Sequence, residues 1–164
     1  MHPSFLGTAL LLAVTPLWAQ SGAADVQKIV QADYAARDTA FMQRDINATL
    51  AHYAPDFVGV SNTNKAHDLK EERADFLKTF ALPAKSLVTK STIEKFSLAK
   101  GGTEAIVTVH KHGILLFVDP QSKQNNVLVL DGVVHDQWTK RPAGWQLTHE
   151  QNSVISATMN GKPI

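Results

Sequence analysis

The sequence contains no cysteine among its 164 residues. That absence excludes disulfides, thiolate nucleophiles and cysteine-ligated zinc or iron–sulfur centres. An excess of charge of either sign is also missing, because sixteen Lys and Arg residues accompany fifteen Asp and Glu residues, for a formal net charge of +1. A chain with this balance offers no basic surface for nucleic acid or an anionic membrane. Its length suits a single domain.

The first 24 residues carry none of the chain's Lys, Arg, Asp or Glu side chains. The apolar run in this stretch, residues 5–14, is shorter than the roughly 20 residues that cross a bilayer, and small residues follow from Ala19. This layout is typical of a secretory signal peptide, with cleavage after Ala19 or as late as Ala23. We therefore expect residues 1–19 to be removed, leaving a periplasmic or secreted protein without a membrane span.

Three stretches after this segment show helical signals. Apolar side chains recur every three or four residues over 25–43, which predicts an amphipathic helix. Asp45 can cap a second helix that runs to Tyr53. Asp68, followed three residues later by Glu71, has the pattern of a capping box and predicts the start of a third helix.

The second half of the chain reads as long strands separated by turns rich in glycine, proline and polar residues: 86–99, 103–118, 126–139 and 145–156. Helices followed by long antiparallel strands predict an α+β fold, with the N-terminal helices packed on the concave face of a strongly curved antiparallel sheet. Strands of this length exceed the usual five or six residues, so we expect bends or bulges. The predicted domain covers residues 25–156, and residues 157–164 form a C-terminal tail.

The last two hairpins decide which polar side chains meet. With the final turn centred on residues 142–143, antiparallel pairing sets Asp136 opposite His149. The preceding hairpin sets His110 opposite His135. A register error of one residue would exchange the two faces of a strand. The face predicted to lie under the helices is apolar except for five polar residues: Lys111, Asp136, His149, Gln151 and Ser153.

Polar groups on an apolar concave face need partners, because their burial is costly. A carboxylate beside an imidazole can act as a general base, so Asp136 and His149 are the candidate catalytic residues. Arg37 interrupts the apolar stripe of the first helix, where its guanidinium could bind a carboxylate or an enolate. The candidate ligand-binding residues are Tyr34, Arg37, Tyr53, Lys111, Trp138 and Gln151. A purely structural interpretation stays open, in which Arg37 pairs with Asp136 and nothing reacts.

The opposite face of the sheet gathers four potential metal ligands: His110, His112, His135 and Glu150. Two histidines separated by one residue point to the same side of a strand, and a third with a carboxylate could complete a metal shell. We predict no metal site, because the glutamate that follows such a pair in cupins is missing. Many apolar residues share this face, which favours a homodimer interface. No cofactor is expected.

Two stretches of the sequence resemble a known family. Residues 41–46 lead into residues 50–57 as a helix, an aspartate, a second helix and a Tyr-Ala-x-Asp-Phe turn. Residues 136–138 lead through 144–147 to 151–153 as a closing hairpin. Both resemble the cone-shaped nuclear-transport-factor-2-like superfamily, which includes the SnoaL-like cyclases, the ketosteroid isomerases and exported proteins of unknown function. The resemblance covers nearly all of the chain after the signal segment.

The resemblance implies a fold that serves many activities. The ketosteroid isomerase reaction needs a carboxylate base and an oxyanion hole built from a tyrosine and a protonated acid. Those roles fall near Ser61, Arg37 and Asp136, and only Asp136 has suitable chemistry. We therefore do not expect that activity. A SnoaL-like aldol cyclisation would use Asp136 and His149 as its acid–base pair.

Three functions remain open at this stage. The first choice is an exported domain that binds a small, partly apolar molecule inside the cone. The second is a cofactor-independent proton-transfer enzyme, an isomerase, cyclase or dehydratase that acts next to a carbonyl through Asp136 and His149. The third is a structural or protein-interaction module whose cone is filled by its own side chains.

Overall fold

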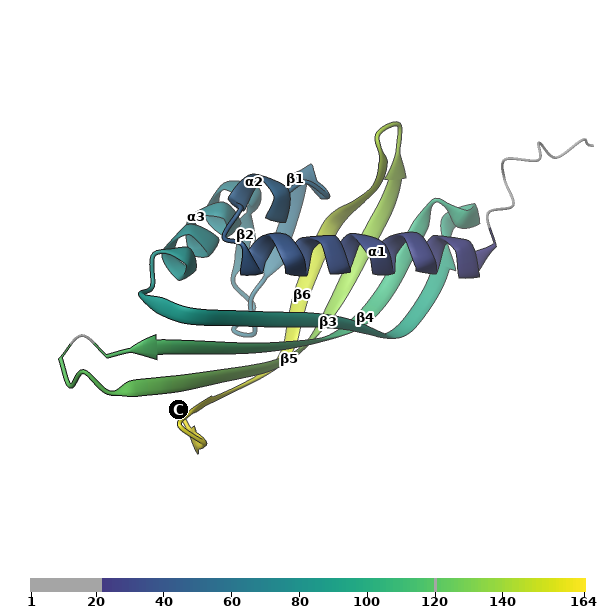
Figure 1. Cartoon of the computed structure of the whole chain (residues 1–164). Coiled ribbons are helices and arrows are strands. Elements are labelled where there is room, and N and C mark those ends of the chain that lie inside the picture. Colours follow the sequence, from purple (N-terminus) through teal and green to yellow (C-terminus); the bar gives the residue numbers. More distant parts are fainter. Residues whose placement is uncertain (1–21, 120) are drawn as a thin grey trace, which may run out of the picture.

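A seven-stranded sheet curves around one long helix (Figure 1). The computed structural model describes residues 22–119 and 121–164, so the predicted signal peptide, residues 1–19, lies outside the described residues. The elements follow one another as α1 Ala23–Met42, α2 Ile46–Thr49, β1 Tyr53–Val60, β2 Ala66–Asp68, α3 Leu69–Phe80, β3 Ala84–Ala99, the 3₁₀ turn Lys100–Gly102, β4 Glu104–Val118, β5 Asn125–Arg141, β6 Gly144–Met159 and β7 Lys162–Pro163. The predicted α+β class, with helices first and long strands afterwards, is confirmed.

Helix α1 crosses the concave face of the sheet (Figure 1). Its buried side chains follow a spacing of three and four, as the sequence predicts for a helix packed on one face: Val26, Val30, Tyr34 and Arg37. Arg37 is only 9% exposed. The helix therefore carries a guanidinium into the interior at the position where its apolar stripe is interrupted.

The second predicted helix is shorter than expected. Asp45 caps α2 as predicted, because its carboxylate accepts hydrogen bonds from the backbone N–H groups of Asn47 and Ala48. The helix ends at Thr49, and Tyr53 already belongs to β1, so the predicted extension to Tyr53 is wrong. Pro55 disfavours helical backbone at the residue before it. The capping box of α3, Asp68 with Glu71, is confirmed.

The sheet has the strand order β2-β1-β6-β5-β4-β3, with β7 paired to β6. It is mixed, because β1 pairs with β6 in parallel while the other pairs are antiparallel. Between β4 and β5 the register differs by two residues from the prediction, and Val133 lies opposite His110 in place of His135. A shift of two residues leaves every side chain on its predicted face.

The hairpin between β5 and β6 contains the irregularity that matters most for the site. Its turn at residues 142–143 is confirmed, and Trp138 pairs with Leu147 as expected. The register then shifts at Thr148, whose hydroxyl donates to the carbonyl of Gln137 at 3.0 Å. Beyond this bulge Glu150 lies opposite Asp136, so the predicted pairing of Asp136 with His149 is wrong. One extra residue exchanges the two faces of β6.

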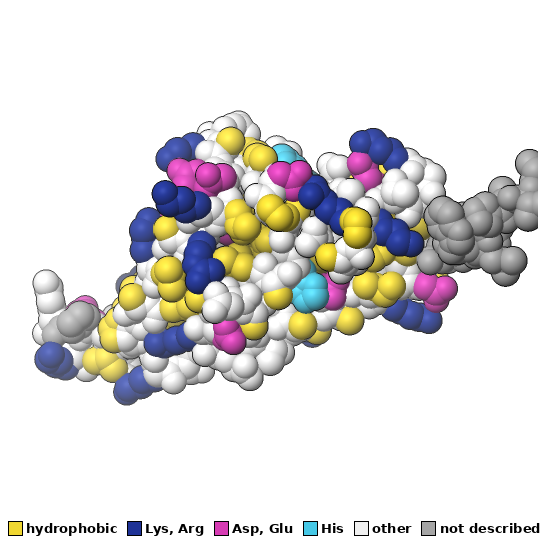
Figure 2. All heavy atoms as spheres, turned by 90° about the horizontal axis from the view of Figure 1, so that it is seen from above, with side chains coloured by type: hydrophobic (Ala, Val, Ile, Leu, Met, Phe, Trp, Pro, Cys, Tyr) yellow, Lys and Arg dark blue, Asp and Glu magenta, His cyan; other side chains and the backbone are white. Residues whose placement is uncertain are grey.

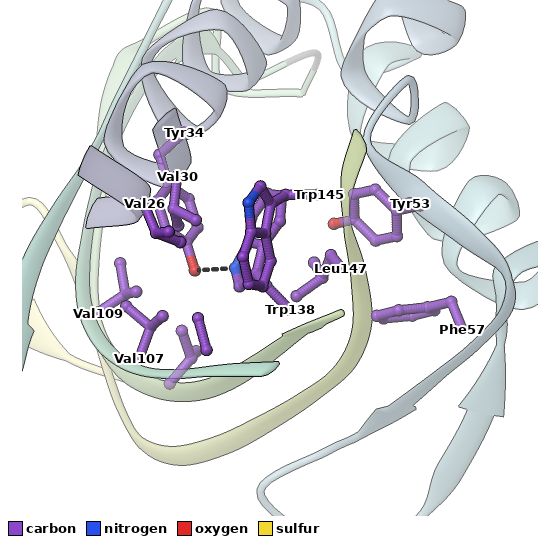
Figure 3. Close-up of a cluster of buried hydrophobic side chains, with 12 residues drawn as sticks. Val26, Val30, Tyr34, Tyr53, Phe57, Val107, Val109, Trp138, Trp145 and Leu147 are labelled. Carbon is purple, nitrogen blue, oxygen red and sulfur yellow. Dashed lines mark hydrogen bonds between the residues drawn. The ribbon is translucent and has the colours of Figure 1, made fainter. Parts of the chain in front are cut away.

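The concave side under the first half of α1 is filled by a hydrophobic core (Figure 3). Burial of these side chains supplies the main favourable term for folding. Its buried members come from α1 and from β1, β4, β5 and β6: Val26, Val30, Tyr34, Tyr53, Phe57, Ala105, Val107, Val109, Val134, Trp138, Trp145 and Leu147.

The far ends of β3, β4 and β5 project beyond α1, at the end of the molecule that carries α3 (Figure 1). Leu128 and Leu130 continue the inner face of β5 into this projection, where Leu130 is 43% exposed. At the end of the chain, residues 157–159 continue β6 and Lys162–Pro163 pair back on it, so the stretch predicted as a tail contributes to the sheet. Among the described residues, no helix is long and apolar enough to cross a membrane.

Candidate functional site

Tyr34, Asp136 and Trp138 form a hydrogen-bonded group at the centre of the core. The Tyr34 hydroxyl donates to Asp136 Oδ2 at 2.5 Å and accepts from Trp138 Nε1 at 3.0 Å, the contact drawn in Figure 3. The two rings meet edge to face with centroids 5.3 Å apart. None of the three residues is more than 1% exposed. This part of the cone is therefore filled by the protein's own side chains.

Glu150 lies beside Asp136 on the inner face, across the β5–β6 ladder. Its Oε2 accepts a hydrogen bond from Lys111 Nζ at 2.6 Å and lies 3.6 Å from Arg37 Nη1. Lys111 comes from β4 and Arg37 from α1. Four elements, α1, β4, β5 and β6, thus bring two cations and two carboxyl groups together inside the cone.

The two neighbouring carboxyl groups differ in acidity. Burial and the negative charge of Glu150 raise the pKa of Asp136 to about 6. Burial would also raise the pKa of Glu150, but the charges of Lys111 and Arg37 outweigh burial and lower that pKa to about 2. Glu150 is therefore ionised at neutral pH, while Asp136 exchanges its proton close to neutrality.

Three buried polar atoms of this region have no hydrogen-bond partner among the described residues: Arg37 Nη1, Tyr53 Oη and Asp136 Oδ1. The Arg37 guanidinium lies 5.4 Å from the ring centroid of Tyr53 and 5.8 Å from that of Tyr34, so both rings offer it cation–π contacts. Most buried polar atoms in proteins are paired. Arg37 Nη1 and the two other atoms therefore have hydrogen-bonding capacity that a further polar group could use.

An imidazole and a carboxylate also meet near the interior, but they are not the predicted ones. His67 Nε2 and Glu72 Oε2 lie 2.8 Å apart, with side chains 19% and 14% exposed. The His67 ring packs directly over Gly59, where a Cβ atom would come within 2.2 Å of Nε2. Burial and the nearby Glu150 raise the pKa of Glu72. Strand β2, which the sequence analysis did not predict, positions His67.

Two adjoining hollows open beside this cluster. The polar pocket, about 220 Å³, is lined by Arg37, Asp38, Phe41, Glu72, Phe76, Thr89, Ser91, Lys111, Glu150 and Asn152. The apolar groove, about 310 Å³, runs along the inner face of the projecting strands, with Phe41, Leu82, Leu87, Leu115, Leu128 and Leu130 among its lining residues. The two share four lining residues: Phe41, Thr89, Lys111 and Asn152.

Apolar and charged side chains share the surface over the strand ends. Seen from above (Figure 2), hydrophobic side chains emerge between Lys and Arg side chains, with some Asp and Glu side chains, on the half of the molecule that carries α3 and the projecting strand ends. Leu82, which lines the apolar groove, is 42% exposed. An apolar groove that opens on the surface next to a polar pocket is the usual form of a small-molecule site.

The structure gathers some of the predicted site residues and separates others. Tyr34, Arg37, Tyr53, Lys111, Asp136 and Trp138 all lie inside the cone, but only Arg37 and Lys111 line the polar pocket. Gln151 and His149 flank the bulge-shifted Glu150 and therefore lie on the outer face, where Gln151 is exposed. Sequence reasoning placed Glu150 on the outer face and overlooked Asn152 and His67. Tyr34 lies one helical turn before Arg37, and its hydroxyl donates to Asp136.

The outer face lacks the four-ligand arrangement that the histidine spacing suggested. Glu150 is absent from this face, and His135 contacts Thr108. His110 and His112 both approach Asp131 Oδ1, at 3.3 Å and 2.7 Å. Among the described residues, no group of three or more His, Asp or Glu side chains has a geometry that could hold a metal ion.

Comparisons with known proteins identify the fold. No family model matches the sequence, and a search of curated proteins finds no match. Among solved structures, a conserved protein from Planctomyces limnophilus DSM 3776 has a TM-score of 0.68 at 15% identity, over 82% of this chain and 99% of that one. A protein of unknown function from Shewanella oneidensis MR-1, described as nuclear-transport-factor-2-like, has a TM-score of 0.60 at 18% identity, over 77% and 97%. The chain has the nuclear-transport-factor-2-like cone fold.

The same fold is found in enzymes. A hexachlorocyclohexane dehydrochlorinase from Novosphingobium barchaimii LL02 has a TM-score of 0.61 at 10% identity, over 86% of this chain and 91% of that one. At these identities the likeness concerns the fold alone, because one fold serves many activities. The function of this nuclear-transport-factor-2-like domain has to be argued from its own side chains.

Two tyrosines of the cluster offer a matched pair of substitutions. We expect Tyr34→Phe to lower the free energy of unfolding by about 1–3 kcal/mol, because it removes the donor to Asp136 Oδ2 and the acceptor of Trp138 Nε1. Tyr53→Phe should change it by less than about 0.5 kcal/mol, since the Tyr53 hydroxyl has no partner to lose. Urea denaturation of both variants measures the difference. Equal losses would contradict the hydrogen-bond assignment.

The raised pKa of Asp136 predicts a pH dependence of stability. A carboxyl group whose folded pKa, about 6, exceeds its ordinary value of 3.8 binds its proton more tightly in the folded state. The free energy of unfolding should therefore fall by about 2 kcal/mol as the pH rises from 4 to 7. Below pH 4.5 the lowered pKa of Glu150 acts in the opposite direction, and stability falls as the pH drops.

Urea denaturation at several pH values measures this profile, and Asp136→Asn should reduce the decline between pH 4 and pH 7, leaving the part due to Glu72, whose pKa is also raised. The matched control is Asp75→Asn, which removes an exposed carboxylate paired with Lys78 on α3. A decline of undiminished size in Asp136→Asn would show that another group causes it.

Proposed function

We propose that the protein binds a small, partly apolar molecule, whose polar part occupies the polar pocket and whose apolar part lies in the apolar groove. The observation that carries this proposal is Arg37 Nη1, a buried donor on a residue that lines the polar pocket, which makes no hydrogen bond with the described residues and has Glu150 only at ion-pair distance, 3.6 Å. A ligand that pairs with this atom would remove the cost of leaving it without a partner. The filled core around Trp138 lies beside this site, and Trp138 lines neither hollow.

The shared lining residues make the two hollows one site. Thr89 and Lys111 border both of them, so a molecule that enters along the projecting strands meets the charged cluster at its inner end. Combined, they are large enough for a ligand with an apolar body and a polar head. This geometry supports binding over the third alternative of the sequence analysis, a cone filled by its own side chains.

A bulky side chain at Thr89, which borders both hollows, tests this function. Thr89→Trp should abolish binding of 1-octanol, used as a neutral amphipathic probe, because the indole would occupy space that borders both hollows. The matched control is Thr92→Trp, which places the same side chain at an exposed position of the same strand, opposite His110. Amide NMR shifts of Ser91, Lys111 and Asn152 report occupation of the site. The proposal fails if octanol shifts none of these amides in the unmodified protein.

A proton-transfer enzyme is the second candidate, and the His67–Glu72 pair favours it. A carboxylate 2.8 Å from an imidazole nitrogen orients the ring, as a proton-transfer enzyme requires of its acid–base group. Glu72 borders the polar pocket, whereas Asp136 lies behind it and His149 lies outside the cone. His67 with Glu72 therefore replaces Asp136 with His149 as the acid–base pair of this alternative.

Deuterium exchange tests the second candidate without knowledge of the substrate. In D₂O the protein should accelerate exchange of the protons next to the carbonyl of 2-octanone, measured by NMR, and His67→Asn should reduce that rate at least tenfold, in the usual range for loss of a general base, about 10²–10⁴. The control His135→Asn changes an exposed histidine of the outer face. Equal exchange rates with and without protein would rule out this activity.

We also propose that the protein is exported and forms a homodimer through the outer face of the sheet. The charge-free first 24 residues support export. The exposure of Ile106 and Val127, 43% and 37%, supports a covered outer face in the assembled protein. Both statements stay predictions.

A further inference from the structure

The interior of the cone holds more acidic groups than basic ones. Four carboxyl groups lie in or directly behind the polar pocket: Asp38, Glu72, Asp136 and Glu150. The fixed cations that face them are Arg37 and Lys111. Even a protonated His67 would leave the carboxyl groups in excess. Charges in an interior of low dielectric interact strongly, so this imbalance selects the charge of any further occupant.

The hydrogen bonds of these carboxyl groups show which of them still lack positive charge. Asp38 is satisfied by Ser91, whose N–H and hydroxyl donate to its two oxygens at 2.6 Å and 2.9 Å. Asp136 keeps one oxygen without a partner. Glu72 is hydrogen-bonded to the imidazole of His67, and the charges of Arg37 and Lys111, which also face Glu150, act on it as well. Burial is the main cause that raises the pKa values of Glu72 and Asp136; the charge of Glu150 adds to it, and the charges of Arg37 and Lys111 offset only part of it.

Arg37 alone would suggest a different ligand. Its unpaired Nη1 suits an oxygen atom, and the sequence analysis assigned it to a carboxylate or an enolate. A ligand carboxylate would, however, become the fifth acidic group of this interior, with Glu150 3.6 Å from the same nitrogen. The repulsion between like charges then opposes the contact with Arg37. An uncharged oxygen or a water molecule can accept from Nη1 without that repulsion.

We propose that the natural ligand is an amphipathic amine, whose ammonium group binds between Glu72 and Glu150 and whose apolar chain lies in the groove along β3, β4 and β5. This inference rests on the proposed binding function and adds the charge and shape of the ligand. The ammonium group supplies the missing positive charge. The groove beside the polar pocket covers the apolar chain with Leu87, Leu115 and Leu128, and Leu130 lies at its exposed side.

Three probes of equal chain length separate the possible head groups. Calorimetric titration of the full protein with octylamine, 1-octanol and octanoate at pH 7 should give octylamine the highest affinity, about tenfold above octanol, as for a charge-assisted contact. Octanoate should bind more weakly than octanol. Butylamine and hexylamine should bind more weakly than octylamine, by about fourfold for each methylene removed.

Two variants test where the ammonium group and the apolar chain of the ligand bind. Glu72→Gln should lower the affinity for octylamine about tenfold and lower that for octanol by much less, whereas the control Glu94→Gln removes an exposed carboxylate of β3 and should change neither. Leu130→Gln should reduce the increase in affinity from hexylamine to octylamine. Its control is Leu77→Gln, a leucine of equal character on α3 that is 47% exposed and lines neither hollow.

The outcomes distinguish this inference from the proposed function. If octanol binds at the site but octylamine binds no tighter, or octanoate binds tightest, the inference is overturned and the binding function stands. If none of the three probes shifts the amides of Ser91, Lys111 and Asn152, both fall. Octylamine binding that Glu72→Gln weakens no more than Glu94→Gln does would be attraction to the protein's general charge, and would also overturn the inference.

Discussion

The bulge at Thr148 is the constraint on which the interior of this protein depends. Up to that residue β6 presents Leu147 to the core, and after it the strand presents Glu150. Without the extra residue, His149 would face Asp136 and the interior would hold one carboxylate fewer. The hydrogen bond from the Thr148 hydroxyl to the carbonyl of Gln137 holds the displaced residue against β5. The charge of the cone is therefore decided by a feature of the backbone.

The filled core around Trp138 and the open apolar groove have different physical origins. Around Trp138 the concave side is covered by α1, and aromatic and apolar side chains fill the space. Beyond the end of α1 the strands continue, and the apolar groove lies along their inner face (Figure 1). The charged cluster lies at the boundary between these two regions, where its groups are buried by the core and still border the pocket.

The sequence predicts features whose signals are local. Each of these signals is carried by residues that lie close together in the sequence. The confirmed examples are the capping box of Asp68 and Glu71, the periodicity of α1 and the turn at residues 142–143. The bulge could not be predicted in this way, because Thr148 is an ordinary strand residue and its displacement depends on a carbonyl of the neighbouring strand. The position of one candidate catalytic residue, His149, depended on that single register step.

The parallel pairing of β1 with β6 was also beyond local signals, since it joins segments far apart in the chain. It brings Gly59 beside Glu150, and through Gly59 it positions His67. Sequence reasoning found the tyrosines, Arg37 and Asp136 because each interrupts or completes an apolar pattern. It missed His67, whose short strand has no such pattern.

The close packing of the His67 ring on Gly59 has an evolutionary consequence. A methyl group at position 59 would overlap the ring atoms of residue 67, so a larger residue at one position requires a smaller or displaced one at the other. In any descendant of this chain, the residues at positions 59 and 67 are therefore expected to change together. The absence of a side chain at position 59 leaves the space that the imidazole occupies.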